Sequence, residues 1–198
     1  MASETDIANW ALAHLGQGLT IADLTEASTE ARACAQFFEP ARDEMLAEFD
    51  WPFATVIDEL TLVEEDPNED WEYSYRYPTD CLKLRRILSG ARMDSQSSAI
   101  PYKIAQDSSG MLVFTDQEDA QVEYTIRKDA IGLWPIKPCL ALSYRLAMYI
   151  TPRIIQDERK LSSVLERMYM MSVSSARAAA ANEEQMPPMP PPEMIAGR

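Results

Sequence analysis

Residues 9–54 read NWALAHLGQGLTIADLTEASTEARACAQFFEPARDEMLAEFDWPFA, and this stretch predicts two helices that run into a turn. Apolar residues recur at helical spacing up to Gly16, where we expect the first helix to end. Ser28 is a candidate N-cap for the second helix, whose apolar face is expected to continue to about Phe49. The chain is therefore expected to begin with a pair of amphipathic helices.

From Val56 onward the apolar pattern changes to a period of two, which is typical of half-buried strands. Strand candidates lie at residues 60–63, 73–77, 82–85, 87–88, 103–105, 112–115 and 122–127. The connections are too short for crossover helices, so we expect antiparallel pairing. Residues 94–99 are polar and rich in serine, and they are expected to form an exposed loop.

Helical spacing returns after Pro138, which suits a first helical turn, and Thr151-Pro152 is expected to interrupt it. A fourth helix is expected from Asp157 to Asn182 or Glu183. Because helices flank a β block, we expect an α+β fold: a helical bundle built from both chain ends with an inserted antiparallel β domain and an extended C-terminal arm. The expected divisions are residues 1–55 and 134–184 for the bundle, 56–133 for the β domain and 185–198 for the arm.

The composition limits the classes of function. The chain has 198 residues, 46% of them hydrophobic, and a formal charge of −14, as expected of a folded acidic protein. The basic residues Lys83, Arg85 and Arg86 alternate with strand-like residues and form the main basic cluster, so sequence-specific nucleic-acid binding is not expected. No apolar run approaches the roughly 20 residues of a membrane helix, and the start of the chain lacks a basic signal region. We expect no membrane partner.

Residues that could carry chemistry are few. The three cysteines, Cys34, Cys81 and Cys139, are far apart in apolar contexts and are expected to be buried free thiols. His14 is the only histidine, and we expect it to be packed or at the surface rather than catalytic. No nucleophile, zinc or nucleotide motif occurs, so we predict no catalytic residue, no cofactor and no metal. Carboxylates such as Glu64-Glu65-Asp66 leave one possibility open, because a glycosidase needs only two of them.

The N-terminal stretch resembles the start of phage head-to-tail adaptors, a family that includes the tail tubular protein A of short-tailed phages. In that family a short helix closes on Leu-Gly, and a second helix with an aromatic…Arg-Asp…Leu pattern runs into a Trp-x-Phe-Ala turn. The matching residues here are Leu15, Gly16, Ile21, Leu24, Phe37, Arg42, Asp43, Met45, Leu46, Trp51, Phe53 and Ala54.

Two later segments are similar to the same family. Residues 75–84 read YRYPTDCLKL, which matches an aromatic-Arg-x-Pro-x-Asp-Cys-Leu motif at the entry to the β region. Residues 141–147 read ALSYRLA and follow Trp134, as in a family helix that follows a Trp element. The chain departs from the family at residues 129–134, so the resemblance implies the helix but not the loop before it.

The resemblance implies a structural virion protein of the bacteriophage head–tail junction, made in the host cytoplasm, and not an enzyme. Such a connector docks on the portal protein and assembles as a homo-oligomeric ring, a dodecamer, around the DNA channel. It then offers a platform to the next tail component, a nozzle or tail tube protein, and DNA passes without specific binding during ejection. The excess of acidic residues would suit a channel wall, although it equally aids solubility. The alternative function is a tail-associated glycan hydrolase with a carboxylate pair in the β domain.

Two sets of interaction residues follow from this resemblance. The arm is expected to be extended because it is rich in proline, and either to dock on the portal or to be an unstructured end. Its expected portal-binding residues are Met186, Pro187, Pro188, Met189, Pro190, Pro191, Pro192 and Met194. Subunit contacts are expected at Arg42, Asp43, Arg76 and Asp80. The alternatives for these four are solvated charge on the second helix and an Arg76–Asp80 ion pair across Pro78.

Overall fold

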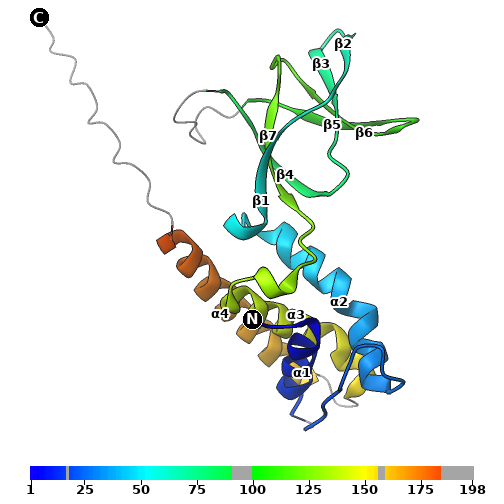
Figure 1. Cartoon of the computed structure of the whole chain (residues 1–198), viewed down its shortest axis with the longest axis vertical. Coiled ribbons are helices and arrows are strands. Elements are labelled where there is room, and N and C mark those ends of the chain that lie inside the picture. The colour runs from blue at the N-terminus through cyan, green and yellow to red at the C-terminus, as the bar shows by residue number, and fades with distance from the viewer. Residues whose placement is uncertain (17, 91–99, 156–158, 184–198) are drawn as a thin grey trace, which may run out of the picture.

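A computed structural model describes residues 1–16, 18–90, 100–155 and 159–183 (Figure 1). Within these residues the chain forms four α-helices and seven strands, and every strand pairing is antiparallel. The expected mixed α+β class and the antiparallel pairing are confirmed. The predicted loop at residues 94–99 and the predicted arm at residues 185–198 lie outside the described residues.

The helices are α1 (Glu4–His14), α2 (Thr29–Glu48), α3 (Ile136–Ile154) and α4 (Arg159–Glu183). The predicted N-cap of α2 is confirmed, because the Ser28 hydroxyl accepts a hydrogen bond from the Ala31 amide at 3.2 Å. The expected interruption at Thr151-Pro152 is wrong, since α3 continues to Ile154. In this last turn the Thr151 hydroxyl donates to the Ala147 carbonyl at 2.5 Å, and the Thr151 carbonyl accepts from the Ile155 amide at 2.9 Å.

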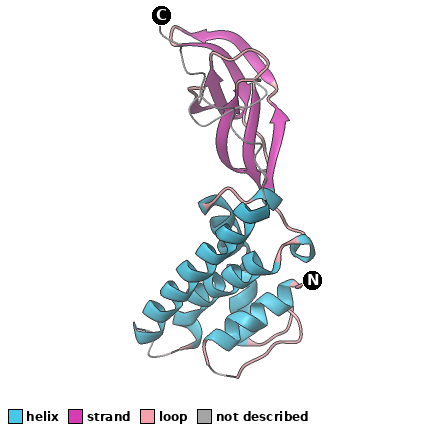
Figure 2. Ribbon diagram, turned by 90° about the vertical axis from the view of Figure 1, so that its left-hand side faces the viewer, coloured by secondary structure: helices cyan, strands magenta, loops and turns pink. Residues whose placement is uncertain are grey.

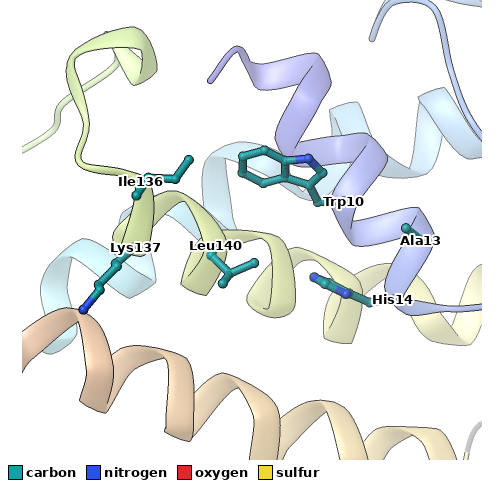
Figure 3. A pocket seen from close by; sticks show the side chains of 6 residues that line it. All are labelled: Trp10, Ala13, His14, Ile136, Lys137 and Leu140. Atoms are coloured by element: carbon teal, nitrogen blue, oxygen red, sulfur yellow. The ribbon is translucent and has the colours of Figure 1, made fainter. Parts of the chain in front are cut away.

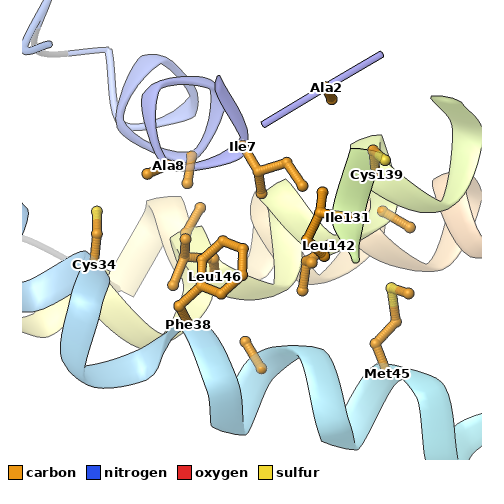
Figure 4. Close-up of a cluster of buried hydrophobic side chains, with 14 of the residues drawn as sticks. Ala2, Ile7, Ala8, Cys34, Phe38, Met45, Ile131, Cys139, Leu142 and Leu146 are labelled. Carbon is orange, nitrogen blue, oxygen red and sulfur yellow. The ribbon is translucent and has the colours of Figure 1, made fainter. Parts of the chain in front are cut away.

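Helix α3 lies at the centre of the helical part and contacts α1, α2 and α4. Buried apolar side chains of the helices form one core, in which Ile7 of α1, Phe38 and Met45 of α2, and Leu142 and Leu146 of α3 are labelled in Figure 4. Hydrophobic burial at about 25 cal/mol per Å² is the main stabilising contribution of such a core. Trp51, just after α2, is fully buried in the same cluster and donates its indole N–H to the Met45 carbonyl at 3.0 Å.

The strands lie together at one end of the molecule, beyond the ends of the helices (Figure 2). They are β1 (Thr55–Glu59), β2 (Leu62–Asn68), β3 (Trp71–Arg76), β4 (Cys81–Leu88), β5 (Lys103–Asp107), β6 (Gly110–Thr115) and β7 (Gln121–Ile126). One sheet has the order β1-β7-β4 and the other the order β2-β3-β6-β5. A second apolar core lies in this part and includes Tyr75, Ile87, Val113 and Val122.

No strand candidate covers β1, and the other strands differ from the expected ones mainly at two places. The candidate at residues 60–63 covers the connection between β1 and β2 and the start of β2. Leu60 lies in this connection and donates its amide to the Ala120 carbonyl at 2.9 Å. The separate candidates at residues 82–85 and 87–88 are one strand, β4, whose register against β7 shifts between Leu84 and Arg86. A register shift changes which residues face the core, and so it breaks the alternation read from the sequence.

Candidate functional site

A groove of about 350 Å³ lies between α1 and α3 (Figure 3). It is lined by Trp10, Ala13, His14, Ile136, Lys137 and Leu140. Almost all of its wall is apolar, and in Figure 3 the Lys137 amine points away from Trp10, toward α4. We call this the α1–α3 groove.

A second groove, of about 220 Å³, lies between α3 and α4 and adjoins the first. It is lined by Lys137, Leu140, Tyr144, Met168, Met171, Ser172 and Ser175. Lys137 and Leu140 border both grooves, so the two form one apolar face across α1, α3 and α4. We call the second the α3–α4 groove and the two together the apolar face.

Several large side chains of the apolar face are open to solvent. Ile136 is 63% exposed, Met171 61% and Leu140 40%. On α4, the exposed residues Val164, Met168 and Met171 follow one another at steps of four and three, which places them on one stripe of the helix. Contiguous exposed apolar surface of this kind marks sites of interaction with other proteins or segments.

His14 sits at the edge of the apolar face in a defined geometry. Its ring stacks on Tyr144 with centroids 3.9 Å apart, and its Nε2 lies 3.0 Å from the Ser143 hydroxyl. The Ser143 hydroxyl donates to the Leu140 carbonyl at 2.7 Å, so we assign the proton to Nε2, which donates to Ser143. Burial lowers the pKa of His14 below its ordinary value. Of the two expected states, packed or at the surface, His14 takes the packed one, although Ser143 lies 129 residues away and carries no local sequence signal.

The lowered pKa of His14 predicts a loss of stability in weak acid. The unfolded chain takes up a proton at about pH 6.5, whereas the folded chain resists protonation until a lower pH, so the free energy of unfolding falls as pH drops through this window. His14→Gln keeps a donor toward Ser143 but cannot titrate. We therefore expect urea unfolding at pH 7.5 and pH 5.5 to show a smaller loss in this variant than in the original chain. Equal losses in both chains would contradict the assignment.

The predicted subunit residues Arg42 and Asp43 lie in an ion-pair network within the chain. Arg42 is only 3% exposed, and its guanidinium contacts Asp43 at 2.9 Å and Asp129 at 2.8 Å. Asp43 also contacts Arg127 at 2.9 Å. The expectation of solvated charge is therefore wrong for Arg42, because the segment that follows β7 covers this side of α2. A subunit contact for these two residues stays a prediction.

Arg76 and Asp80 do not form the expected ion pair. Arg76 instead makes a two-pronged contact with Asp107 at the end of β5, with both nitrogen–oxygen distances at 3.1 Å. Asp80 accepts a hydrogen bond from the Tyr124 hydroxyl at 3.3 Å. The reason is the pairing of β3 with β6, which brings the β5–β6 turn beside Arg76. Arg76 lowers the pKa of Asp107 below its ordinary value through this hydrogen bond.

Arg85 of β4 joins the β strands to the end of α2, a role that the sequence did not reveal. Its Nε contacts Asp50 at 2.5 Å and donates to the Thr125 hydroxyl at 2.8 Å. Its Nη2 donates to the carbonyls of Leu46 at 3.2 Å, Ala47 at 3.3 Å and Phe49 at 2.7 Å. The last carbonyls of a helix lack partners within the helix, so this guanidinium caps α2. Burial lowers the pKa of Arg85, against the opposite influence of Asp50.

A second polar network holds α2, α3 and α4 together. Arg145 of α3 pairs with Glu44 and Glu48 of α2, the latter at 3.2 Å, and lies 5.0 Å from the centre of the Tyr169 ring of α4. The hydroxyls of Tyr149 and Tyr169 donate to Glu44 and Glu48 respectively. The network therefore links three helices to one another. Burial of Tyr169 within it raises the pKa of this tyrosine.

The groups considered for catalysis are dispersed. Glu64, Glu65 and Asp66 are exposed on β2, and neither groove is lined by a carboxylate. Cys34 and Cys139 are buried as expected, and burial raises the pKa of each thiol to about 11, whereas Cys81 is half-buried. Among the described residues no group of His, Cys, Asp or Glu side chains is arranged to hold a metal ion. The described helices include none that is both long and apolar enough to cross a membrane.

The predicted portal-binding residues, from Met186 to Met194, lie outside the described residues. The sequence matches no model of a known protein family and no characterised protein. The resemblance to head-to-tail adaptors therefore stays a prediction, carried by the quoted motifs alone.

Proposed function

We propose that this chain is a structural assembly protein, a phage head-to-tail adaptor that acts by binding and not by turnover. The observation that carries the proposal is the apolar face across α1, α3 and α4, with Ile136, Leu140 and Met171 open to solvent. Exposed apolar side chains gathered in this way mark a surface that another segment or protein covers, as in the components of an assembly. Methionines suit this purpose because their flexible side chains fit uneven surfaces.

The contacts of α3 with helices from both ends of the chain support one helical bundle as the portal-side unit. In this proposal the arm reaches the portal, while the β strands supply ring contacts and the platform for the next tail component. The ring is a dodecamer by resemblance, and the acidic surface faces the DNA path. Asp43, Arg76 and Asp80 are candidate subunit contacts, whereas Arg42 contributes by orienting Asp43.

The deciding experiment is electron microscopy with mass determination of the purified chain, alone and mixed with the portal protein encoded beside it. We expect a ring of this protein seated on the portal, from which the copy number can be counted. A chain that stays monomeric and ignores the portal would rule out the connector role. A control portal from an unrelated phage should show no ring, because the surfaces that dock must match in shape.

A tail-associated glycan hydrolase is the alternative from another class. No observation on the described residues favours it, since the exposed carboxylates of β2 border neither groove. A glycan-cleavage screen is the next step only if the portal experiment fails.

A further inference from the structure

We infer that the apolar face is a docking site for the chain's own C-terminal arm, residues 185–198, which folds back across α4 before any partner is met. This inference goes beyond the adaptor function and does not rest on it. It is argued from the position of the end of α4, from the chemistry of the two grooves and from the composition of the arm.

The position of the end of α4 brings the arm to the apolar face. Only four residues separate Ile154 at the end of α3 from Arg159 at the start of α4, so the two helices run antiparallel. The last groove residue on α4 is Ser175, and the helix continues for eight more residues to Glu183, which adds about 12 Å at 1.5 Å per residue. The arm therefore starts about two helical turns beyond the α3–α4 groove.

The arm is long enough to return. Fifteen residues follow Glu183, and at about 3.1 Å per residue an extended chain of that length spans roughly 46 Å. After about 12 Å to come back to Ser175, more than 30 Å of chain remains for the two grooves. On this path the stretch around Met189 would come level with Ser172, within the α3–α4 groove.

The composition of the arm suits grooves whose walls offer few hydrogen-bonding groups. A peptide buried in an apolar groove leaves each backbone N–H without a partner, at a cost of about 1–3 kcal/mol per group. Residues 186–192 read MPPMPPP, and the five prolines among these seven residues have no backbone N–H to bury. The methionines of the same stretch can fill the uneven space between Leu140, Tyr144 and Met171.

The charge of the grooves does not oppose an acidic segment. Lys137 borders both grooves and forms no ion pair with any described residue, and neither groove contains a carboxylate. Glu184 directly precedes the arm and Glu193 lies in it, and no carboxylate of either groove repels them. As the occupant of the apolar face, the arm of the same chain is favoured over a second copy of the protein. A tethered segment reaches its site at an effective concentration in the millimolar range.

The test is disulfide crosslinking in the full chain. Ser172→Cys on the α3–α4 groove is combined with Met189→Cys on the arm, and the matched control combines Ser174→Cys, exposed on the other side of α4, with the same Met189→Cys. Under mild oxidation we expect an intrachain crosslink that forms about tenfold faster in the groove pair than in the control pair, since docking raises the effective concentration. The single variant Met189→Cys controls for reaction with the native thiols.

A groove variant completes the test. Leu140→Asp places a charge in both grooves at an exposed position, so the fold is kept while the crosslinking rate should fall to that of the control pair. Leu133→Asp is the matched control, because Leu133 is 69% exposed and borders neither groove. Equal rates for the groove and control pairs, or crosslinked dimers in place of intrachain bonds, would overturn the inference.

Discussion

Replacing Arg85 with methionine is expected to lower the free energy of unfolding by about 3 kcal/mol, as for other buried, multiply hydrogen-bonded charges. The substitution removes the donor to three carbonyls at the end of α2 and leaves Asp50 without its ion-pair partner. Methionine keeps much of the side-chain volume, so the loss should come from the unpaired polar groups and not from a cavity.

Urea unfolding at neutral pH measures this effect, with Lys83→Met as the matched control. Lys83 lies two residues before Arg85 on β4 but is exposed, so the same replacement should change the free energy by no more than about 0.5 kcal/mol. If Arg85→Met behaved like Lys83→Met, the helix-capping role of Arg85 would be wrong.

The Arg85 contacts also explain how the strands are held against the helices. The chain passes from α2 into β1 through Trp51, and it returns from β7 to α3 beside the Arg42, Asp43 and Asp129 network. Arg85 therefore stabilises the first connection between helices and strands, and the ion pairs of Arg42 stabilise the second. These two sets of contacts restrict the orientation of the β strands, which would suit the proposed ring, where each copy must present the same surface.

Much of this architecture was readable from local patterns. The start of α2 at Ser28 follows from a cap residue before an apolar stripe, and the strands follow from alternation after Val56. The continuation of α3 through Pro152 was not readable, because a proline usually ends a helix, whereas this helix packs against three others along its length. A proline rule describes the average helix and not the packing around a particular one.

The candidate site was less accessible to sequence reasoning, because its contacts join distant segments. Trp10 and His14 come from α1, whereas Leu140 comes from α3, and only the packing of the helices creates the groove between them. Arg85 looked like one member of a basic strand, and nothing local indicated the carbonyls at the end of α2. The apolar stripes did predict helices, but a stripe does not tell which of its members stay exposed.

Removal of residues 186–198 is expected to weaken attachment to the portal ring at least about a hundredfold, which corresponds to about 2.8 kcal/mol. The arm supplies the apolar anchors of the proposed contact, and anchors carry most of the energy of an interface. The truncated chain should keep its far-ultraviolet circular dichroism, since the two cores are built from residues before the arm. Sedimentation of the mixture with the portal gives the affinity, and unchanged attachment would contradict the portal role of the arm.

The two roles of the arm make a joint prediction that separates them. If the arm rests on the apolar face until the portal competes for it, only the fraction of chains with a free arm can attach, and the apparent affinity is reduced by that fraction. Leu140→Asp should then tighten attachment to the portal relative to Leu133→Asp, because it releases the arm without changing its sequence. Weaker attachment of Leu140→Asp would instead show that the apolar face itself contacts the portal. The two proposals can thus fail separately. The crosslinking experiment tests the docking of the arm on the apolar face, and the attachment experiment tests the adaptor function.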